Sequence, residues 1–238
     1  MKKTFAVIMI GMLAVSMTAC GGQATQNSSS QATTAAVAET TAAASEHVKA
    51  GGYTDSASPV VPDEVKALFD KAAEGLTGVG YVPVAYVSSQ VVAGMNHLLL
   101  CKATPTTADA TATYALVTLY EDLNGGAEIT DIRNSDVQAP VAEEEPMDGA
   151  VTESGTPEVT AEAKEALTKA TDLLTGATYE PVALLSTQVV NGTNYTMLCK
   201  ITTVTETPES DYAIVTVCAG SDGTANIIEA FEFAPSQS

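Results

Sequence analysis

The chain contains two copies of one sequence, and this internal repeat limits what it can fold into. Residues 90–94 read Gln-Val-Val-Ala-Gly, and the stretch returns 98 positions later, at residues 188–192, as Gln-Val-Val-Asn-Gly. The match continues without a gap from Val61 to about Ser135. A repeat of that length is longer than the units that stack in most solenoid proteins, so it predicts a whole small domain present twice.

Each copy is expected to contain one helix followed by strands. In the second copy, Thr156 precedes Pro157 and Glu158, which is typical of a helix start with a threonine cap and an acid near the positive end of the helix dipole. Apolar residues then recur at helical spacing: Val65, Leu68, Phe69, Ala72 and Leu76 in the first copy, and Ala163, Leu167, Ala170 and Leu174 in the second.

Four strands are expected after the first helix, at residues 81–90, 95–104, 113–120 and 127–133. In the second copy, Tyr195, Met197, Cys199 and Ile201 alternate with more polar residues, so one face should cover the helix and the other meet water. The short connections favour an antiparallel sheet. The expected fold class is α+β, with one helix packed across a four-to-five-stranded antiparallel sheet, present twice.

The first 19 residues are predicted to be a signal peptide. Lys2 and Lys3 precede an apolar run of about a dozen residues, which is too short to cross a bilayer comfortably. The run ends at Thr18-Ala19-Cys20, which resembles a bacterial lipobox. That resemblance implies cleavage before Cys20 and lipidation of its side chain, with an ordinary secretory signal as the alternative.

Composition indicates how the rest of the chain is divided. Residues 20–49 are rich in Gln, Ser, Thr and Ala and are predicted to form a disordered tether. Residues 50–137 and 149–238 are the two expected domains, and the acidic stretch 138–148 is the expected linker. We expect an extracytoplasmic protein that is attached to a bacterial membrane only through its lipid anchor.

The formal net charge of −19 argues against several partners and activities. Nucleic acid and anionic lipid headgroups would be repelled, so no nucleic-acid partner is expected. The sequence has no cluster of His and Cys at metal-ligand spacing, no Gly-rich phosphate loop and no Ser-His-Asp order. His97 and Cys101 would be about 13 Å apart on one strand, too far for a catalytic pair. We therefore expect a monomer that is not an enzyme, with no catalytic residue, metal or cofactor.

Three cysteines fall in the expected strands. Cys101 and Cys199 occupy the same place in the two copies, on the apolar side of a strand, so buried thiols are expected. A bridge between Cys199 and Cys218 is the alternative, because a hairpin could bring the two close together in an oxidising compartment.

The element order and the doubled loop resemble the cystatin family, particularly the stefins and plant cystatins. That family carries Gln-x-Val-x-Gly in the first hairpin after its helix, and both copies have this pattern. The second copy continues Gly192-Thr193-Asn194-Tyr195, as many family members do, and Thr156-Pro157-Glu158 resembles the stefin helix start.

The resemblance implies reversible inhibition of papain-like cysteine proteases. Cystatins fill the active-site cleft with an N-terminal trunk, the Gln-x-Val-x-Gly loop and a second hairpin. The implied binding residues are, in the first loop, Gln90, Val91, Val92, Ala93 and Gly94; in the second loop, Gln188, Val189, Val190, Asn191 and Gly192; in the trunks, Gly51, Gly52 and Gly149; and in the second hairpins, Leu123, Asn124, Gly125, Asp222 and Gly223.

The copies depart from the family pattern at three places. Neither second hairpin has a Trp, and Leu123 alone remains of the Leu-Pro usual in stefins. Asn191 replaces an alanine, and the second trunk has Gly149-Ala150 in place of a glycine pair. The alternative function is a non-inhibitory binding or structural module on the cell surface, in which the repeated pattern only folds the hairpin.

Overall fold

Strands make up most of the residues that the structure, a computed structural model, describes: 52–107, 110–140 and 149–236. These residues of both repeats belong to one unit, Glu46–Ser238. The predicted signal peptide, Cys20, the tether and Gly51 lie outside the described residues, as do residues 141–148 of the expected linker. In the described part of the chain, no helix is long and apolar enough to cross a membrane.

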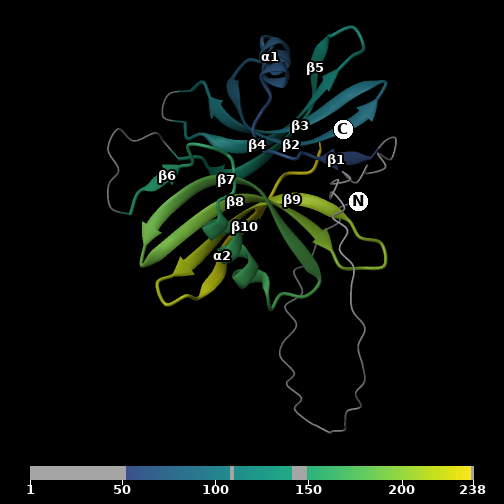
Figure 1. Ribbon diagram of the computed structural model, residues 1–238. Coiled ribbons are helices and arrows are strands. Elements are labelled where there is room, and N and C mark those ends of the chain that lie inside the picture. The colour runs from purple at the N-terminus through teal and green to yellow at the C-terminus, as the bar shows by residue number, and fades with distance from the viewer. Residues whose placement is uncertain (1–51, 108–109, 141–148, 237–238) are drawn as a thin grey trace, which may run out of the picture. The chain divides into compact units, whose positions relative to one another are not determined.

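The strands form two five-stranded antiparallel sheets, one from each repeat (Figure 1). The first sheet has the order β1 (Tyr53–Asp55), β2 (Val79–Val92), β3 (Gly94–Pro105), β4 (Thr113–Glu121) and β5 (Ala127–Gln138). The second consists, in the same sequential order, of β6 (Val151–Glu153), β7 (Ala177–Val190), β8 (Gly192–Thr203), β9 (Ser210–Gly220) and β10 (Ala225–Glu232). In both sheets a three-residue strand therefore lies at the edge, beside a strand of 14 residues.

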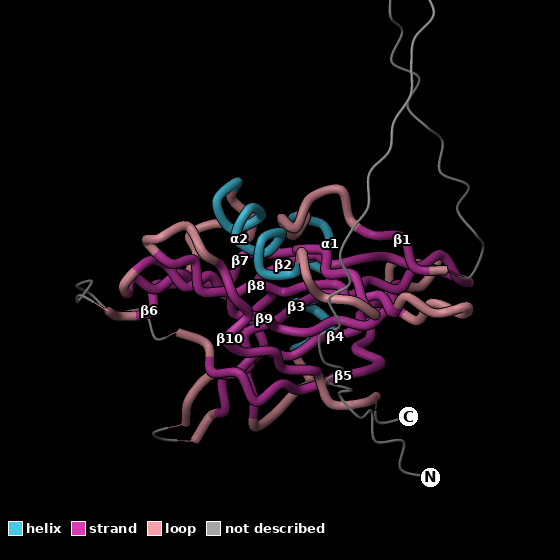
Figure 2. The backbone as a smooth tube through the Cα atoms, turned by 90° about the horizontal axis from the view of Figure 1, so that it is seen from below, coloured by secondary structure: helices cyan, strands magenta, loops and turns pink. Residues whose placement is uncertain are grey.

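The expected α+β class is wrong, because the protein is mainly β (Figure 2). The helices α1 (Asp63–Ala73) and α2 (Ala161–Thr171) have only 11 residues each. The helix α1 contacts mainly β5, and α2 contacts mainly β10 and to a lesser extent β7 and β9, so two short helices accompany ten strands. Leu76 and Leu174 were expected on the helices but follow them, and they are 37% and 47% exposed.

The helix α2 also begins later than the sequence predicts. Thr160 is its N-cap, and the Thr160 side chain accepts a hydrogen bond from the Ala163 N–H at 3.2 Å. The carbonyl of Pro157 instead accepts a hydrogen bond from the Leu184 N–H at 2.9 Å, which holds Pro157 against β7. The helix therefore starts only after the chain has left the edge of the sheet.

The central strands of each sheet are buried on both faces. One face packs on the helix of its own repeat, in a core that contains Phe69 and Leu99 in the first repeat and Leu167 and Met197 in the second. The other faces of the two sheets pack on each other and form a shared core. Its buried members are Ala85, Val87, Leu100, Tyr114, Leu116, Ala139, Ala183, Leu185, Leu198, Ile214 and Phe233. The expectation that this second face meets water is wrong, because the other repeat covers it.

The described cysteines are all free. Cys199 lies opposite Ala213, whereas Cys218 lies opposite Asn194, five residues away from Cys199 along β8. That offset is about 17 Å at the rise of a strand, so the alternative bridge between Cys199 and Cys218 is excluded. Burial raises the pKa of the Cys199 thiol to about 12 and also raises that of Cys101.

Candidate functional site

The loop at residues 90–94 is the tip of the hairpin formed by β2 and β3. Val92 pairs with Gly94 across the tip, and Val91 and Val92 are 50% and 41% exposed. In the second repeat, Val189 and Val190 are 69% and 43% exposed at the tip between β7 and β8. Both tips thus present pairs of apolar side chains to solvent.

Gly94 fits its place for two reasons. Its φ is +130°, a conformation that residues with a side chain rarely adopt. A Cβ at this position would overlap the carbonyl oxygen of Glu121 and approach Tyr120 to 3.0 Å. Tyr120 also donates a hydrogen bond from its hydroxyl to the Ala93 carbonyl at 2.6 Å, so β4 holds the tip closely. Gly192 has the equivalent position against the Ala219 carbonyl.

Each loop begins with a glutamine, Gln90 or Gln188, whose side chain is hydrogen-bonded at the base of the loop. The Asn96 side chain donates to Gln90 Oε1 at 2.8 Å, and that of Asn194 donates to Gln188 Oε1 at 3.0 Å. Gln188 Nε2 also donates to the Gly149 carbonyl at 2.7 Å, which connects a predicted trunk residue to the loop. A tip fixed in this way would lose little conformational freedom on binding.

The structure brings the other predicted pieces to the same end of the first sheet. Tyr53 pairs with Gln90, so Gly52 lies beside the loop. Met95 pairs with Glu121, the last residue of β4, so the hairpin containing Leu123 follows directly beside the loop on its other side. Leu123 is 84% exposed. We call this surface, made by Gly52, Val91, Val92 and Leu123, the first loop end.

A second loop end, made by Gly149, residues 189–191, Asp222 and Gly223, has the same layout. Val151 pairs with Gln188, and Gly192 pairs with Gly220, which places trunk, loop and hairpin together. Its hairpin is more polar, because Ser221 replaces Leu123 and Asn191 replaces Ala93. The Ser221 hydroxyl donates a hydrogen bond to the Asn191 side chain at 3.2 Å.

Both second hairpins are shaped by an aspartate. Hydrogen bonds from the Gly126 and Asn124 N–H groups lower the pKa of the Asp122 carboxyl, and Gly125 beside them has a φ of +78°. In the second repeat, hydrogen bonds from Thr224 lower the pKa of Asp222, and Gly223 has a φ of +84°.

A buried polar network beneath the first loop end was not predicted. His97 is 4% exposed, with Nδ1 at 2.9 Å from the Tyr86 hydroxyl and Nε2 at 3.2 Å from Glu121 Oε2. The network joins β2, β3 and β4. The second repeat has Leu184, Tyr195 and Ala219 at these places. A comparison of the two copies could have revealed the network, because Tyr86, His97 and Glu121 are all different in the second copy.

Each loop end is also held by a lysine from the other repeat. Lys200 Nζ lies 2.5 Å from the carboxylate of Asp55, the last residue of β1. Lys102 Nζ lies 3.3 Å from the carboxylate of Glu153, the last residue of β6. The two lysines occupy equivalent positions in the repeat, as do the two acids. These ion pairs add a contact from the other repeat to the strand pairing that already holds β1 and β6.

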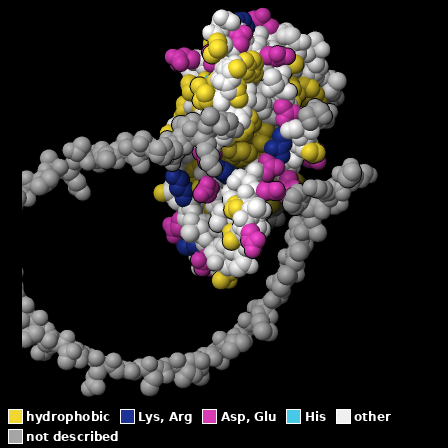
Figure 3. Space-filling model, turned by 90° about the vertical axis from the view of Figure 1, so that its right-hand side faces the viewer, with side chains coloured by type: hydrophobic (Ala, Val, Ile, Leu, Met, Phe, Trp, Pro, Cys, Tyr) yellow, Lys and Arg dark blue, Asp and Glu magenta, His cyan; other side chains and the backbone are white. Residues whose placement is uncertain are grey.

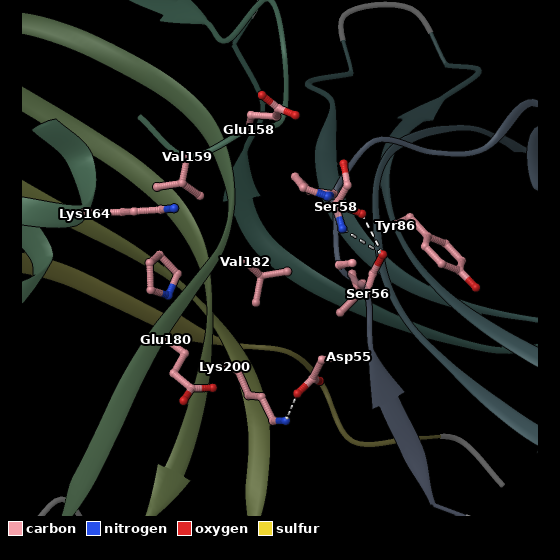
Figure 4. A pocket seen from close by; sticks show the side chains of 14 residues that line it. Asp55, Ser56, Ser58, Tyr86, Glu158, Val159, Lys164, Glu180, Val182 and Lys200 are labelled. Atoms are coloured by element: carbon pink, nitrogen blue, oxygen red, sulfur yellow. Dashed lines mark hydrogen bonds and ion pairs between the residues drawn. The ribbon is translucent and has the colours of Figure 1, made fainter. Parts of the chain in front are cut away.

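A pocket of about 350 Å³ opens beside the Lys200–Asp55 pair (Figure 4). Lys164, Glu158 and Glu180 line it together with this pair. Charges of both signs therefore surround the space, and they favour neither an anion nor a cation. Within the described ranges, no group of three or more His, Cys, Asp and Glu side chains could hold a metal ion.

The protein surface carries much more negative than positive charge. On the face shown in Figure 3, acidic side chains lie among separate hydrophobic patches, in keeping with the net charge of −19. A partner of the loop ends should therefore not be strongly acidic itself.

Replacing Gly94 with alanine should lower the free energy of unfolding by about 3 kcal/mol, because strained backbone and a steric overlap add together. Gly125→Ala is the matched control, since Gly125 also has a positive φ but open space around it. That control should cost about 1–2 kcal/mol. Urea unfolding monitored by circular dichroism measures the free energy of unfolding of both variants. Equal decreases would show that the close approach at Gly94 contributes nothing to the cost of the substitution.

Lys200→Met should loosen β1 in the other repeat. Because Asp55 is half exposed, the pair is worth only about 0.5–1 kcal/mol, so amide hydrogen exchange at Tyr53–Asp55 should become roughly two- to fivefold faster. Lys102→Met should instead accelerate exchange at Val151–Glu153. Unchanged exchange in β1 of the Lys200→Met protein would contradict this role for the lysine.

No protein-family model matches the chain, and no curated protein matches it. The resemblance to cystatins therefore depends on the loop pattern and its neighbours alone.

Proposed function

We propose that the protein is a reversible inhibitor of papain-like cysteine proteases, which fills the active-site cleft with its loop ends. The observation that carries the proposal is the meeting of three separate segments at one end of a sheet. Gly52, the Val91-Val92 tip and Leu123 come from distant parts of the repeat, and strand pairing sets them side by side.

The physical character of this surface suits insertion into a cleft. Val91, Val92 and Leu123 are exposed apolar side chains, and covering them would contribute a few kcal/mol to binding. Hydrogen bonds from Tyr120 and Asn96 already order the tip, which reduces the entropy lost on association. Occlusion of this kind is non-covalent and needs no catalytic group on the inhibitor.

The first loop end is the better candidate. It combines the valine pair with Leu123 and with Tyr53, which is 49% exposed. The second loop end offers the valine pair but has Asn191 and Ser221 bonded to each other beside it. That polar pair leaves less apolar surface to bury, so protease binding at the second loop end should be weaker than at the first.

The setting that we propose is extracytoplasmic. A signal peptide at residues 1–19 and lipidation of Cys20 would anchor the chain to a bacterial membrane, with residues 20–49 as a tether. We propose that the protein works there as a monomer, with proteases and not nucleic acid as its partners.

The test is a titration of papain with the chain comprising residues 21–238. Reversible inhibition is expected, and replacing Val91, Val92, Val189 and Val190 with serine should weaken it at least tenfold because apolar contact is lost. Val60→Ser combined with Ile228→Ser is the matched control, since these side chains are 49% and 51% exposed and belong to neither tip. Full papain activity at tens of micromolar protein would refute the proposal.

A further inference from the structure

We infer, on the basis of the proposed function, that one chain binds two protease molecules at once, one at each loop end, and so bridges them. Contacts between the two repeats determine the direction of the two binding surfaces.

The Lys102–Glu153 pair fixes the direction of one sheet relative to the other. On β3, Gly94 lies at the tip of the first loop, and Lys102 lies near the far end of the strand. Lys102 contacts Glu153, which pairs with Ser186 four residues before the tip of the second loop. The part of the first sheet that is far from its own loop therefore lies near the second loop end.

The Lys200–Asp55 pair makes the reciprocal contact. Lys200 lies far from Gly192 along β8, yet it touches Asp55, which pairs with Ser88 close to the first loop. The Tyr212 hydroxyl also lies 3.5 Å from the Asp55 carboxylate. Both contacts are met when the loop ends of the two sheets point away from each other. Figure 1 agrees, with β1 and β6 on opposite sides of the stacked sheets.

The two tips are consequently far apart. Eight residues from Gly94 to Lys102 and four from Ser186 to Val190 span about 40 Å at the rise of a strand. A partner that buries about 800 Å² of this protein would have a footprint about 30 Å across. Two partners at opposite ends would therefore not overlap.

The contacts between the repeats also prevent both tips from closing on one partner. Besides the shared core, the Arg133 guanidinium makes two hydrogen bonds to the Asp211 carboxylate, at 2.7 and 2.8 Å. The Ala234 N–H donates to the Asn134 carbonyl at 2.8 Å, which attaches the C-terminal segment to β5. The tips are thus held in fixed, opposite directions.

The experiment is sedimentation velocity of residues 21–238 with excess papain whose catalytic cysteine has been alkylated, so that the chain is not cleaved. The expected complex contains two papain molecules. The variants Val91→Ser with Val92→Ser, and Val189→Ser with Val190→Ser, should each bind one papain molecule. The control variant Val60→Ser with Ile228→Ser should still bind two.

The outcomes separate this inference from the proposed function. A complex with one papain molecule, formed by a chain that still inhibits the protease, would overturn the inference and leave the proposed function standing. Absence of both complex and inhibition would overturn the two together.

Discussion

The two sheets pack on each other through one shared core, which sets the arrangement of the whole fold. Leu100 and Leu198 are completely buried in this shared core, as are Leu99 and Met197 beneath the helices. Each sheet is therefore covered by a helix on one face and by the other sheet on the opposite face. A repeat alone would expose its half of the shared core to water, so the two repeats depend on each other for stability.

Polar contacts at the margin of the shared core fix the orientation of one sheet relative to the other. Lys102 with Glu153 and Lys200 with Asp55 repeat one interaction in both directions, as a self-complementary interface between two subunits would. Tyr212 lies beside one of these pairs, and burial raises the pKa of its hydroxyl to about 12. The short strands β1 and β6, and with them the loop ends, take their positions partly from the opposite repeat.

Local patterns in the sequence predicted much of the loop ends but less of their surroundings. The loops and the approximate strands followed from the repeat and from alternation, whereas the trunk and second-hairpin residues came only from the resemblance to cystatins. The predicted start of α2 was wrong because the Pro157 carbonyl accepts a hydrogen bond from β7, and a capping pattern does not indicate such a contact. The second buried face was overlooked although Leu98-Leu99-Leu100 is a continuous apolar run, typical of strands buried on both sides. Contacts such as Lys102–Glu153 depend on how the repeats pack, which local patterns do not encode.

The two repeats should unfold as one cooperative unit, because they share the core that holds both loop ends in place. Differential scanning calorimetry of residues 21–238 measures this cooperativity. We expect a single transition whose calorimetric and van't Hoff enthalpies agree, and Leu100→Ala should shift that whole transition to lower temperature. Two separate transitions, of which Leu100→Ala moves only one, would contradict it.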